Sequence, residues 1–329
     1  MNSSKNNKAF STMRKGVIFL LLAAFAWSWP NVMIRILKSD FDIYTQSFYR
    51  YIGSCVFLFI IGFVFTKKKM IHAAVNLKLL LIPALIMTVH QVFYTAGVFM
   101  TSAVISSLIG RLNAIVIPAL SCIFYADERQ VVKNKSFILG ALIAFVGVAG
   151  VIFGKDAYVE EGFNIGVMFV ILSTISWSVY AVCIKKVIRT IDPLAIISYV
   201  SLISVVLFLP LVLKFGDIRS IGKVSIGMNI LLFVSGILGV GVGNTFYYHA
   251  VKHVGTSISS VFFLLLPFSV GILGFIILGE TLTAMQIVSG FLSIVGCWLV
   301  TGLAKTKPPD TVIAPEGARG LKIGKSKQV

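Results

Sequence analysis

Two segments of this chain, residues 16–37 and 166–187, are copies of one another. GVIFLLLAAFAWSWPNVMIRIL aligns with GVMFVILSTISWSVYAVCIKKV at a constant offset of 150 positions. Eight of the 22 aligned positions are identical, whereas a composition this apolar gives roughly two or three identities by chance. The identities include a Trp-Ser pair, Trp27-Ser28 in the first copy and Trp177-Ser178 in the second. Such a duplication of apolar segments predicts a chain built from two related halves.

The similarity continues beyond this pair of segments. Asp42 corresponds to Asp192 at the same offset. FYTAGVFMTSAVISS at 93–107 corresponds to FYYHAVKHVGTSISS at 246–260 at an offset of 153. Each half therefore carries the same ordered set of apolar segments. The number of segments in each half then decides whether the two halves lie parallel or inverted in a bilayer.

Composition predicts a polytopic membrane protein. Hydrophobic residues make up 57% of the chain, charged residues only 12%, and the mean hydropathy is +0.95. A soluble domain carries about 25% charged residues. The net charge of +17 does not indicate nucleic acid binding, because Lys and Arg lie in short segments between apolar runs and in both tails. We expect the lipid bilayer, and no nucleic acid, as the partner of these charges.

The cysteines and the first apolar run exclude other classes. Cys55, Cys122, Cys183 and Cys297 all fall within apolar runs and form no CxxC pair, so neither a redox site nor a metal site is predicted. No cofactor is expected. The first apolar run is about 22 residues long and lacks a small-residue cleavage site, so it is predicted to be a retained helix.

Ten stretches of the chain are long and apolar enough to span a bilayer, which takes about 20 residues. They are 16–37, 43–65, 77–98, 102–124, 136–153, 164–187, 193–214, 226–250, 256–278 and 284–303. The fold class predicted is an all-α integral membrane protein. The predicted organisation is a disordered cytoplasmic tail (1–13), a first five-helix repeat (14–154), a second (155–303) and a disordered basic cytoplasmic tail (304–329).

The distribution of basic residues predicts the orientation. Twenty-one Lys and Arg residues lie on the side that holds both termini, and five lie on the other side. The excess places both termini in the cytoplasm of a multi-pass protein of the cell (inner or cytoplasmic) membrane. Five spans in each half make the second half enter the bilayer upside down relative to the first. The sequence therefore predicts two inverted five-helix repeats.

These features together resemble the EamA family of the drug/metabolite transporter superfamily. The resemblance covers about residues 14–303. The pieces that carry it are the two Trp-Ser pairs, Arg50, Ala-Asp-Glu at 126–128 and Gly-Glu-Thr at 279–281. No single piece is specific, but their order, spacing and duplication are. The resemblance implies a secondary transporter, usually an exporter of small metabolites, with a central cavity between the halves; it implies no enzyme activity and does not fix the substrate.

The charged residues expected within the spans are all cationic. They are Arg35, Arg50 and Arg111, each about 10 Å or less from the non-cytoplasmic end of its helix at 1.5 Å per residue. Charges at this depth usually face a cavity or a partner. Two interpretations stay open: a site for a carboxylate or phosphate, or structural roles, with Arg35 reaching to the interface and Arg50 binding helix-end carbonyls.

The acidic residues give a complementary signal. All twelve are expected in tails, in loops or at helix ends, so no membrane carboxylate is available to exchange a lipophilic cation for a proton. A proton relay would have to use His90 or His249. A lone histidine in a helix is, however, more often a hydrogen-bonded packing residue.

Uncharged polar and aromatic side chains mark the expected cavity. Trp27 and Trp177 lie about twelve residues into their helices, near the midplane, where an indole N–H needs an acceptor. Trp27, Asn31 and Arg35 share one helix face. The candidate substrate-binding residues are Trp27, Asn31, Arg50, His90, Gln91, Tyr94, Arg111, Trp177, Tyr180, Asn244 and Tyr247. Simple packing of these side chains is the alternative.

Glycines and prolines indicate close helix contacts and bends. Gly140, Gly147 and Gly154 recur every seven residues, and Gly290 and Gly296 lie in the tenth span; such faces let backbones approach. The glycine-rich stretch before Asn244 is the predicted hinge or irregular backbone. The candidate gating or hinge residues are Pro30, Pro118, Gly241, Gly243 and Pro267.

The leading hypothesis is a carrier that works by alternating access and exports small metabolites such as amino acids or related carboxylates. A flippase for a lipid-linked or anionic lipid headgroup could use the same cationic lining. A non-transporting membrane partner protein is a third possibility. The sequence contains no intramembrane carboxylate pair and no metal-ligand spacing, so an enzyme is not predicted. A monomer and a homodimer are both compatible with the sequence.

Overall fold

The computed structural model describes residues 2–101, 106, 109–153, 164–278 and 283–301, without the side chains of residues 2–10, 31 and 274. Within these residues the chain is helical and contains no strand. In chain order the elements are α1 (Asn2–Ile36), η1 (Leu37–Ser39), α2 (Ile43–Val75), α3 (Lys78–Met100), α5 (Asn113–Phe124), α6 (Ala126–Val132), α7 (Lys135–Phe153), α8 (Ile165–Ile188), α9 (Pro193–Phe215), η2 (Ile218–Gly222), α10 (Ile226–Gly236), η3 (Ile237–Gly243), α11 (Asn244–Val254), α12 (Thr256–Val261), η4 (Phe262–Leu265), α13 (Leu266–Leu278) and α14 (Ala284–Thr301).

The predicted fold class is confirmed. In the described part of the chain, nine helical segments are long and apolar enough to cross a membrane, and α5 is a shorter apolar helix within the fourth predicted span. Large apolar side chains remain exposed on the outside of the bundle, for example Ile60 (60%), Val206 (62%) and Ile276 (68%). Such a surface is stable against acyl chains, and helices satisfy their own backbone hydrogen bonds there. The protein is an all-α, multi-pass membrane protein.

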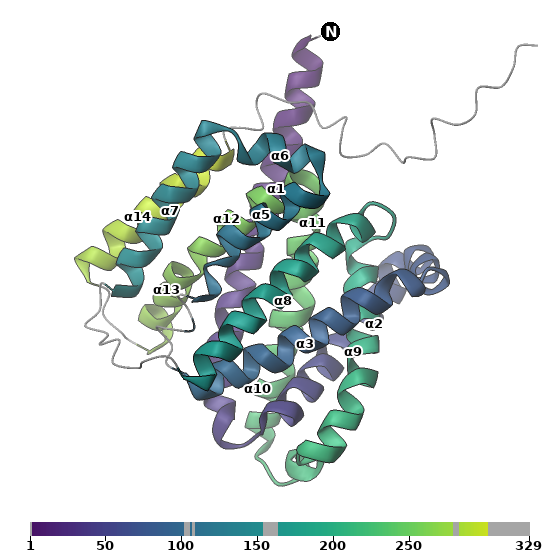
Figure 1. Ribbon diagram of the computed structural model, residues 1–329. Coiled ribbons are helices and arrows are strands. Elements are labelled where there is room, and N and C mark those ends of the chain that lie inside the picture. The colour runs from purple at the N-terminus through teal and green to yellow at the C-terminus, as the bar shows by residue number, and fades with distance from the viewer. Residues whose placement is uncertain (1, 102–105, 107–108, 154–163, 279–282, 302–329) are drawn as a thin grey trace, which may run out of the picture.

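Helix pairing follows a pseudo-twofold relation between the halves. α3 packs on α8, and the repeat-related pair is α11 on α1. α2 packs on α9, α5 on α12 and α7 on α14, and each of these pairs joins repeat-equivalent spans. In Figure 1, α7 and α14 run side by side at one edge of the bundle, whereas α2 and α9 lie at the opposite edge. The helices between these edges come from both halves.

Matching caps start repeat-equivalent helices. Asp42 accepts hydrogen bonds from the backbone N–H groups of Tyr44 and Thr45 and so caps α2. Asp192 caps α9 through the N–H of Leu194. Side-chain caps satisfy donors that have no partner inside the helix. The correspondence of Asp42 and Asp192 in sequence therefore has a local structural cause.

Three elements differ from their predicted bounds. α1 begins at Asn2, although residues 1–13 are predicted to be a disordered tail; this segment has no Gly or Pro, and extending an existing helix is favourable. α2 continues to Val75 past a kink at Thr66, so most of the predicted 66–78 loop is helical. The continuation buries Met70 and Ala73. In the described part of the fourth span, residues 106, 109 and 110 are helical, a turn follows at 111–112, and α5 runs from Asn113 to Phe124.

Glycines do bring helices together as predicted. A Cβ on Gly140 would lie 2.7 Å from the carbonyl oxygen of Gly296 on α14. A Cβ on Gly147 would lie 2.5 Å from the Oγ of Ser293. Absence of these side chains lets α7 and α14 pack closely. Gly154, predicted to extend this face, lies outside the described residues.

Candidate functional site

A cavity of about 410 Å³ lies between the two halves. Its wall includes the last turns of α1, the first half of α2, and parts of α3, α8, η3 and α13. Polar lining residues are Arg35, Arg50, Tyr51, His90, Gln91, Tyr94, Ser106, Arg111, Asn113, Ser173, Thr174 and Asn244. A volume of this order accommodates a small molecule.

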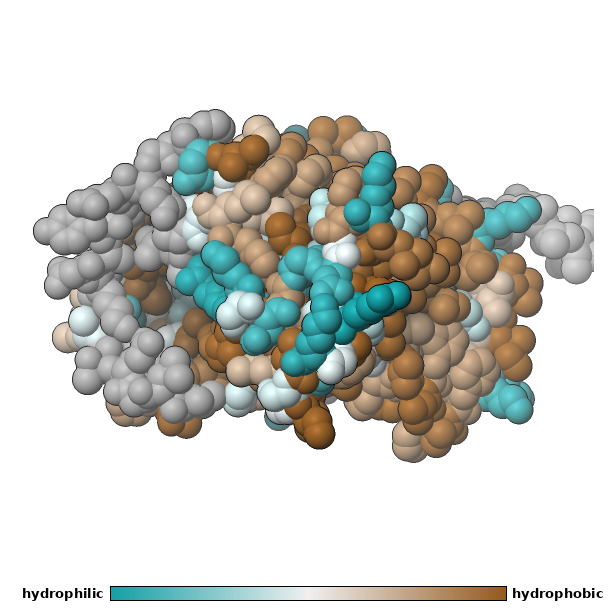
Figure 2. Space-filling view, turned by 90° about the horizontal axis from the view of Figure 1, so that it is seen from below, coloured by the Kyte–Doolittle hydropathy of each residue, from teal (hydrophilic) through white to brown (hydrophobic). Residues whose placement is uncertain are grey.

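The cavity is located toward the end of the bundle that is remote from the N-terminus. Arg35 and Ile36, in the last turn of α1, both line it and are exposed, so the cavity reaches the surface there. Figure 2 looks onto this end, where hydrophilic residues gather near the middle of the face and hydrophobic residues occupy much of the rest. This distribution fits a polar entrance surrounded by lipid-facing helices.

Arg50 is the most deeply placed charge of the wall. Its side chain is 3% exposed, and within the described residues its Nε and Nη1 atoms are buried without a hydrogen-bond partner. A buried charge normally requires a counter-charge or several hydrogen bonds. These two nitrogen atoms of Arg50 therefore do not bind helix-end carbonyls, which is the structural role that the sequence alone leaves open. Its guanidinium group can receive an anionic ligand.

The other two arginines lie on the same cavity. Arg111 donates a hydrogen bond of 2.5 Å from Nη1 to the carbonyl oxygen of Phe263 in the second half. Arg35 is exposed at the entrance. Tyr94 lies within electrostatic reach of Arg35, Arg50 and Arg111. Three guanidinium groups therefore lie on one wall of the cavity.

The glycine-rich stretch predicted to be irregular is a π-helix, η3. Its glycines allow α1 and α2 to approach. A Cβ on Gly239 would lie 2.6 Å from the ring of Pro30, and a Cβ on Gly243 would lie 2.4 Å from Nε1 of Trp27. Trp27 donates from Nε1 to the carbonyl oxygen of Gly239 over 2.9 Å. The irregular helix therefore supplies an acceptor that positions an indole ring on the cavity wall.

His90 is tied to the opposite half of the protein. Its Nδ1 lies 2.9 Å from the carbonyl oxygen of Ser173, and because a carbonyl only accepts, Nδ1 carries the proton. Its ring packs on Trp177 at 5.1 Å and on Tyr94 at 5.8 Å. This geometry matches the packing role that a lone helical histidine usually has. His249 stacks on Phe19 at 5.0 Å instead and does not line the cavity.

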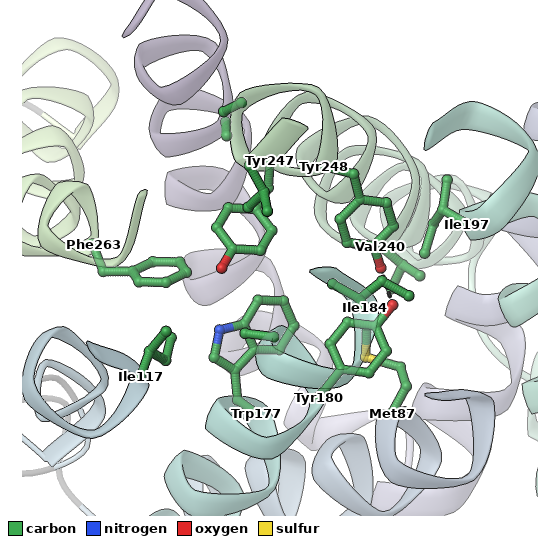
Figure 3. Close-up of a cluster of buried hydrophobic side chains, with 14 of the residues drawn as sticks. Met87, Ile117, Trp177, Tyr180, Ile184, Ile197, Val240, Tyr247, Tyr248 and Phe263 are labelled. Atoms are coloured by element: carbon green, nitrogen blue, oxygen red, sulfur yellow. Dashed lines mark hydrogen bonds between the residues drawn. The ribbon is translucent and has the colours of Figure 1, made fainter. Parts of the chain in front are cut away.

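Aromatic side chains close the cavity on the side of the N-terminus. Trp177 and Tyr180 of α8 face Tyr247 and Tyr248 of α11, with Phe263 beside them (Figure 3). Tyr180, Tyr247 and Tyr248 are fully buried. The hydroxyl groups of Tyr180 and Tyr248 hydrogen-bond to one another across the two helices. We refer to Trp177, Tyr180, Tyr247, Tyr248 and Phe263 as the aromatic floor.

A buried ionic cluster lies beyond the aromatic floor. Lys185 of α8 binds Oε1 of Glu128 at 2.5 Å and Oδ2 of Asp127 at 2.7 Å. Glu128 also accepts hydrogen bonds from the backbone N–H and hydroxyl of Thr256, both 2.9 Å, and from the N–H of Ser257 at 3.2 Å. Lys185 and Glu128 are 4% and 2% exposed. We call Asp127, Glu128, Lys185, Thr256 and Ser257 the clasp.

The clasp joins the two halves of the chain. Its carboxylates belong to α6 of the first half, and its donors belong to α8 and α12 of the second. Lys185 also lies 4.5 Å above the ring of Tyr125. Burial raises the pKa of Tyr125 to about 12, so this residue stays a neutral phenol that stacks under the cation. The clasp and the aromatic floor together keep this end of the bundle closed.

The structure brings most of the predicted site residues to one place. Trp27, Arg50, His90, Gln91, Tyr94, Arg111, Trp177 and Asn244 line the cavity, as do Pro30 and Pro267. Tyr180 and Tyr247 lie in the aromatic floor instead of on the cavity wall. Pro118, Gly241 and Gly243 do not line it either, and the side chain of Asn31 lies outside the described residues. Whether these residues bind or gate remains a prediction.

Sequence reasoning missed part of the wall, and it named Asp127 and Glu128 only as part of a family motif, without their pairing with Lys185. Asn113, Ser173 and Thr174 line the cavity, and Ser178 links to Asn113 by a hydrogen bond of 2.9 Å. A signal for Lys185 was present, because it stands at the repeat position of Arg35 at the offset of 150. A basic residue at both equivalent positions suggests paired roles at the two ends of the bundle.

The described wall carries groups that bind polar ligands. No Asp or Glu is among the residues that line the cavity as described. No group of three or more His, Cys, Asp or Glu side chains that could hold a metal ion occurs in the part of the chain that was placed. Arginine, indole, amide and hydroxyl groups remain, which recognise polar ligands by charge and hydrogen bonds.

A membrane bundle with two related halves, a polar cavity between them and a closed end defines the class of membrane transporters. The EamA-like transporter family matches the chain twice, over residues 14–153 and 164–302. The chain therefore belongs to the EamA-like transporter family, which confirms the resemblance inferred from its motifs.

Curated relatives carry the same general description. The chain is 31% identical over 223 residues to an uncharacterized transporter of Haemophilus influenzae, covering 67% of this chain and 73% of that one. It is 24% identical over 221 residues to the uncharacterized transporter YyaM of Bacillus subtilis, covering 66% and 70%. An uncharacterized transporter of Clostridium kluyveri is 24% identical, with 86% and 92% covered. None of these names states a substrate.

One crystal structure has a similar fold. It superimposes with a TM-score of 0.68, covering 90% of this chain and 97% of that one, at 16% sequence identity. At this identity the likeness concerns the fold alone. The protein is thus a membrane transporter by family, and a transporter of this kind is generally not an enzyme.

Proposed function

We propose that this protein is a secondary transporter that exports small metabolites with an anionic group, such as amino acids or related carboxylates. The observation that carries the proposal is Arg50. It is a buried guanidinium on the wall of a cavity of about 410 Å³, and two of its nitrogen atoms have no hydrogen-bond partner within the described residues. A ligand carboxylate can form paired, charge-assisted hydrogen bonds with such a group.

Alternating access is the proposed mechanism. The cavity is exposed at Arg35 and closed at the opposite end by the aromatic floor and the clasp. With both termini in the cytoplasm, as the distribution of Lys and Arg favours, the cavity faces the outside of the cell. Related halves can exchange their roles, so opening of the clasp and closure around Arg35 would give the inward-facing state.

The proposed partners are a small-molecule substrate and the lipid bilayer of the cell membrane. One chain supplies both halves of the cavity and every member of the clasp. A monomer is therefore sufficient as the transport unit, and a homodimer would consist of two complete units. No nucleic acid is proposed, because the basic residues outside the cavity lie in the tails and in short segments between apolar runs of the sequence.

Flux into and out of proteoliposomes tests the proposal. Purified protein is reconstituted, and the movement of radiolabelled amino acids and carboxylates is compared with that in empty liposomes. We expect saturable flux that is lost in Arg50→Ala and reduced in Arg111→Ala, whereas Lys214→Ala, an exposed cation outside the cavity, leaves flux unchanged. Unchanged flux in both arginine variants, or binding of lipid headgroups without movement of any soluble solute, would contradict the proposal.

A further inference from the structure

The charge of the cavity wall restricts the substrate further than its size does. Arg35, Arg50 and Arg111 bring three positive charges to one cavity. Among the described lining residues, no carboxylate accompanies Arg35 or Arg50. Arg50 is buried, and a charge that is shielded from water interacts strongly with a ligand, so the ligand that binds best is one that contacts both Arg50 and the exposed Arg35.

Zwitterions and singly charged anions fit this wall poorly. A zwitterion contributes no net negative charge, and its ammonium group would be repelled by the guanidinium groups. Several backbone carbonyls that could accept a hydrogen bond from an ammonium group already accept hydrogen bonds from protein side chains. The Gly239 carbonyl accepts from Trp27, that of Phe263 from Arg111, and that of Ser173 pairs with His90.

The remaining polar atoms suit the uncharged part of a ligand. Within the described residues, Oδ1 of Asn244, Nε1 of Trp177 and the hydroxyl of Tyr51 are buried without hydrogen-bond partners. All three residues line the cavity. These are neutral groups, and a hydroxyl or carbonyl group of a substrate can satisfy them. The cavity therefore pairs a cationic side with a neutral, hydrogen-bonding side.

We propose that the cavity selects small organic anions with two negative charges, in which one negative charge of the ligand is compensated by Arg50 and the second by Arg35 at the entrance. This inference rests on the proposed transport function and narrows its substrates at the same site from amino acids and carboxylates in general to anions with two negative charges. Dicarboxylates and phosphate monoesters share this chemistry. A dicarboxylate carries its two negative charges on separate groups, whereas a phosphate monoester carries them on one group.

Competition binding with matched probes tests the inference. Succinate and glycerol 3-phosphate represent the two sources of a double charge, butyrate represents a single charge on the same carbon skeleton as succinate, and alanine represents a zwitterion. Affinities are measured with purified wild-type protein by thermal shift, because binding to the folded state raises the unfolding temperature. We expect at least one of the two dianions to bind about tenfold or more tightly than butyrate and alanine.

Variants then locate the selectivity. Arg50→Gln is expected to weaken binding of the preferred dianion about tenfold or more and to reduce its advantage over butyrate, whereas Arg50→Lys keeps part of the affinity because the charge remains. Lys214→Gln serves as the control, since it removes a cation outside the cavity. Each variant's unfolding temperature without ligand shows that it is folded.

The outcomes separate this inference from the proposed function. If alanine or butyrate is transported and binds as tightly as both dianions or more tightly, the charge selectivity is overturned but the transport function stands. Absence of binding by both dianions also overturns the inference. Absence of flux for every probe, the dianions included, contradicts the transport function itself.

Discussion

Removing Lys185 should destabilise the protein more than its position near a helix end suggests. Lys185 stands between two carboxylates, 2.5 Å from Glu128 and 2.7 Å from Asp127, and is 4% exposed. In Lys185→Met, Glu128 stays buried at 2% exposure without its cation. Removal of one partner from a buried ion pair costs about 3–5 kcal/mol.

The structure places the expected loss at the lower end of this range. Glu128 keeps its hydrogen bonds from Thr256 and Ser257, and Asp127 is 27% exposed and can be solvated. We therefore expect Lys185→Met to lower the free energy of unfolding by about 3 kcal/mol. With about 2 °C per kcal/mol for a chain of this size, the unfolding temperature should fall by about 6 °C.

Glu128→Gln should be milder, because Lys185 then keeps Asp127 and the amide oxygen can still accept from Thr256. A loss of about 1–2 kcal/mol is expected. The double variant should be no less stable than Lys185→Met alone, since it no longer buries an uncompensated carboxylate at position 128.

Thermal unfolding in detergent, followed by tryptophan fluorescence, measures these differences. Lys186→Met is the matched control, because its side chain is the exposed neighbour of Lys185 and surface charges contribute little. The reasoning is refuted if Lys185→Met unfolds at the wild-type temperature, or if the control loses as much stability as Lys185→Met. Additive effects in the double variant would refute the direct pairing of Lys185 with Glu128.

Three further substitutions probe other contacts. Trp177→Phe keeps one aromatic ring but removes the part of the indole that carries Nε1, which has no partner among the described residues; the unfolding temperature should fall modestly because the smaller ring leaves a space at this buried position, while substrate affinity falls severalfold, measured by flux and thermal shift. Gly147→Ala should lower stability by about 1–3 kcal/mol, because its Cβ would lie 2.6 Å from the backbone N of Ser293, whereas Gly222→Ala, with no atom within 4 Å, should be neutral in the same unfolding assay. Arg111→Gln should weaken anion binding in the competition assay and lose the bond to the Phe263 carbonyl, so dianion affinity and unfolding temperature should both decrease.

The path of the helices was predictable because the bilayer imposes one requirement on every span. Apolar length and duplication together predicted an all-α membrane fold, and the structure confirms it. The exact ends were less predictable. Lys67, Lys68 and Lys69 looked like a loop, yet α2 continues through them. A helix that emerges from the apolar region can continue in the polar region when one face, here Met70 and Ala73, finds packing.

The cavity was more predictable than the clasp, for a physical reason. Polar residues such as Gln91 and Asn244 stand out in apolar helices, so their positions alone indicate a site. Lys185 lies at a helix end, where a basic residue ordinarily signals orientation. Its pairing with Glu128, 57 residues away in sequence, depends on how α6 docks beside α8, and no periodicity encodes that contact.

Depth along a helix explains where Tyr180 and Tyr247 lie. Each is three residues beyond a cavity residue, Trp177 and Asn244 respectively. Three residues advance the helix by about 4.5 Å, and both helices run toward the closed end. The same helix faces therefore contribute first to the cavity and then to the aromatic floor.

A pair of glycine substitutions in η3 tests whether the irregular helix positions Trp27. In Gly243→Ala the new Cβ would stand 2.4 Å from Nε1 of Trp27, so the indole must move away from the Gly239 carbonyl that it binds. In Gly241→Ala the nearest atom is Oγ of Ser54 at 3.2 Å, a distance that a small rotation accommodates. Both changes raise helix propensity equally, so any difference between them reports the contact.

We expect Gly243→Ala to lose substrate affinity and to alter tryptophan fluorescence, because the displaced indole also stacks on Phe263 at 5.2 Å and lines the cavity. Gly241→Ala should keep both properties near those of the wild type. Equal losses in the two variants would mean that flexibility of η3 as a whole matters more than the position of Trp27. If both variants keep the substrate affinity and fluorescence of the wild type, the wall of the cavity tolerates movement of Trp27, and Arg50 alone suffices to hold the ligand.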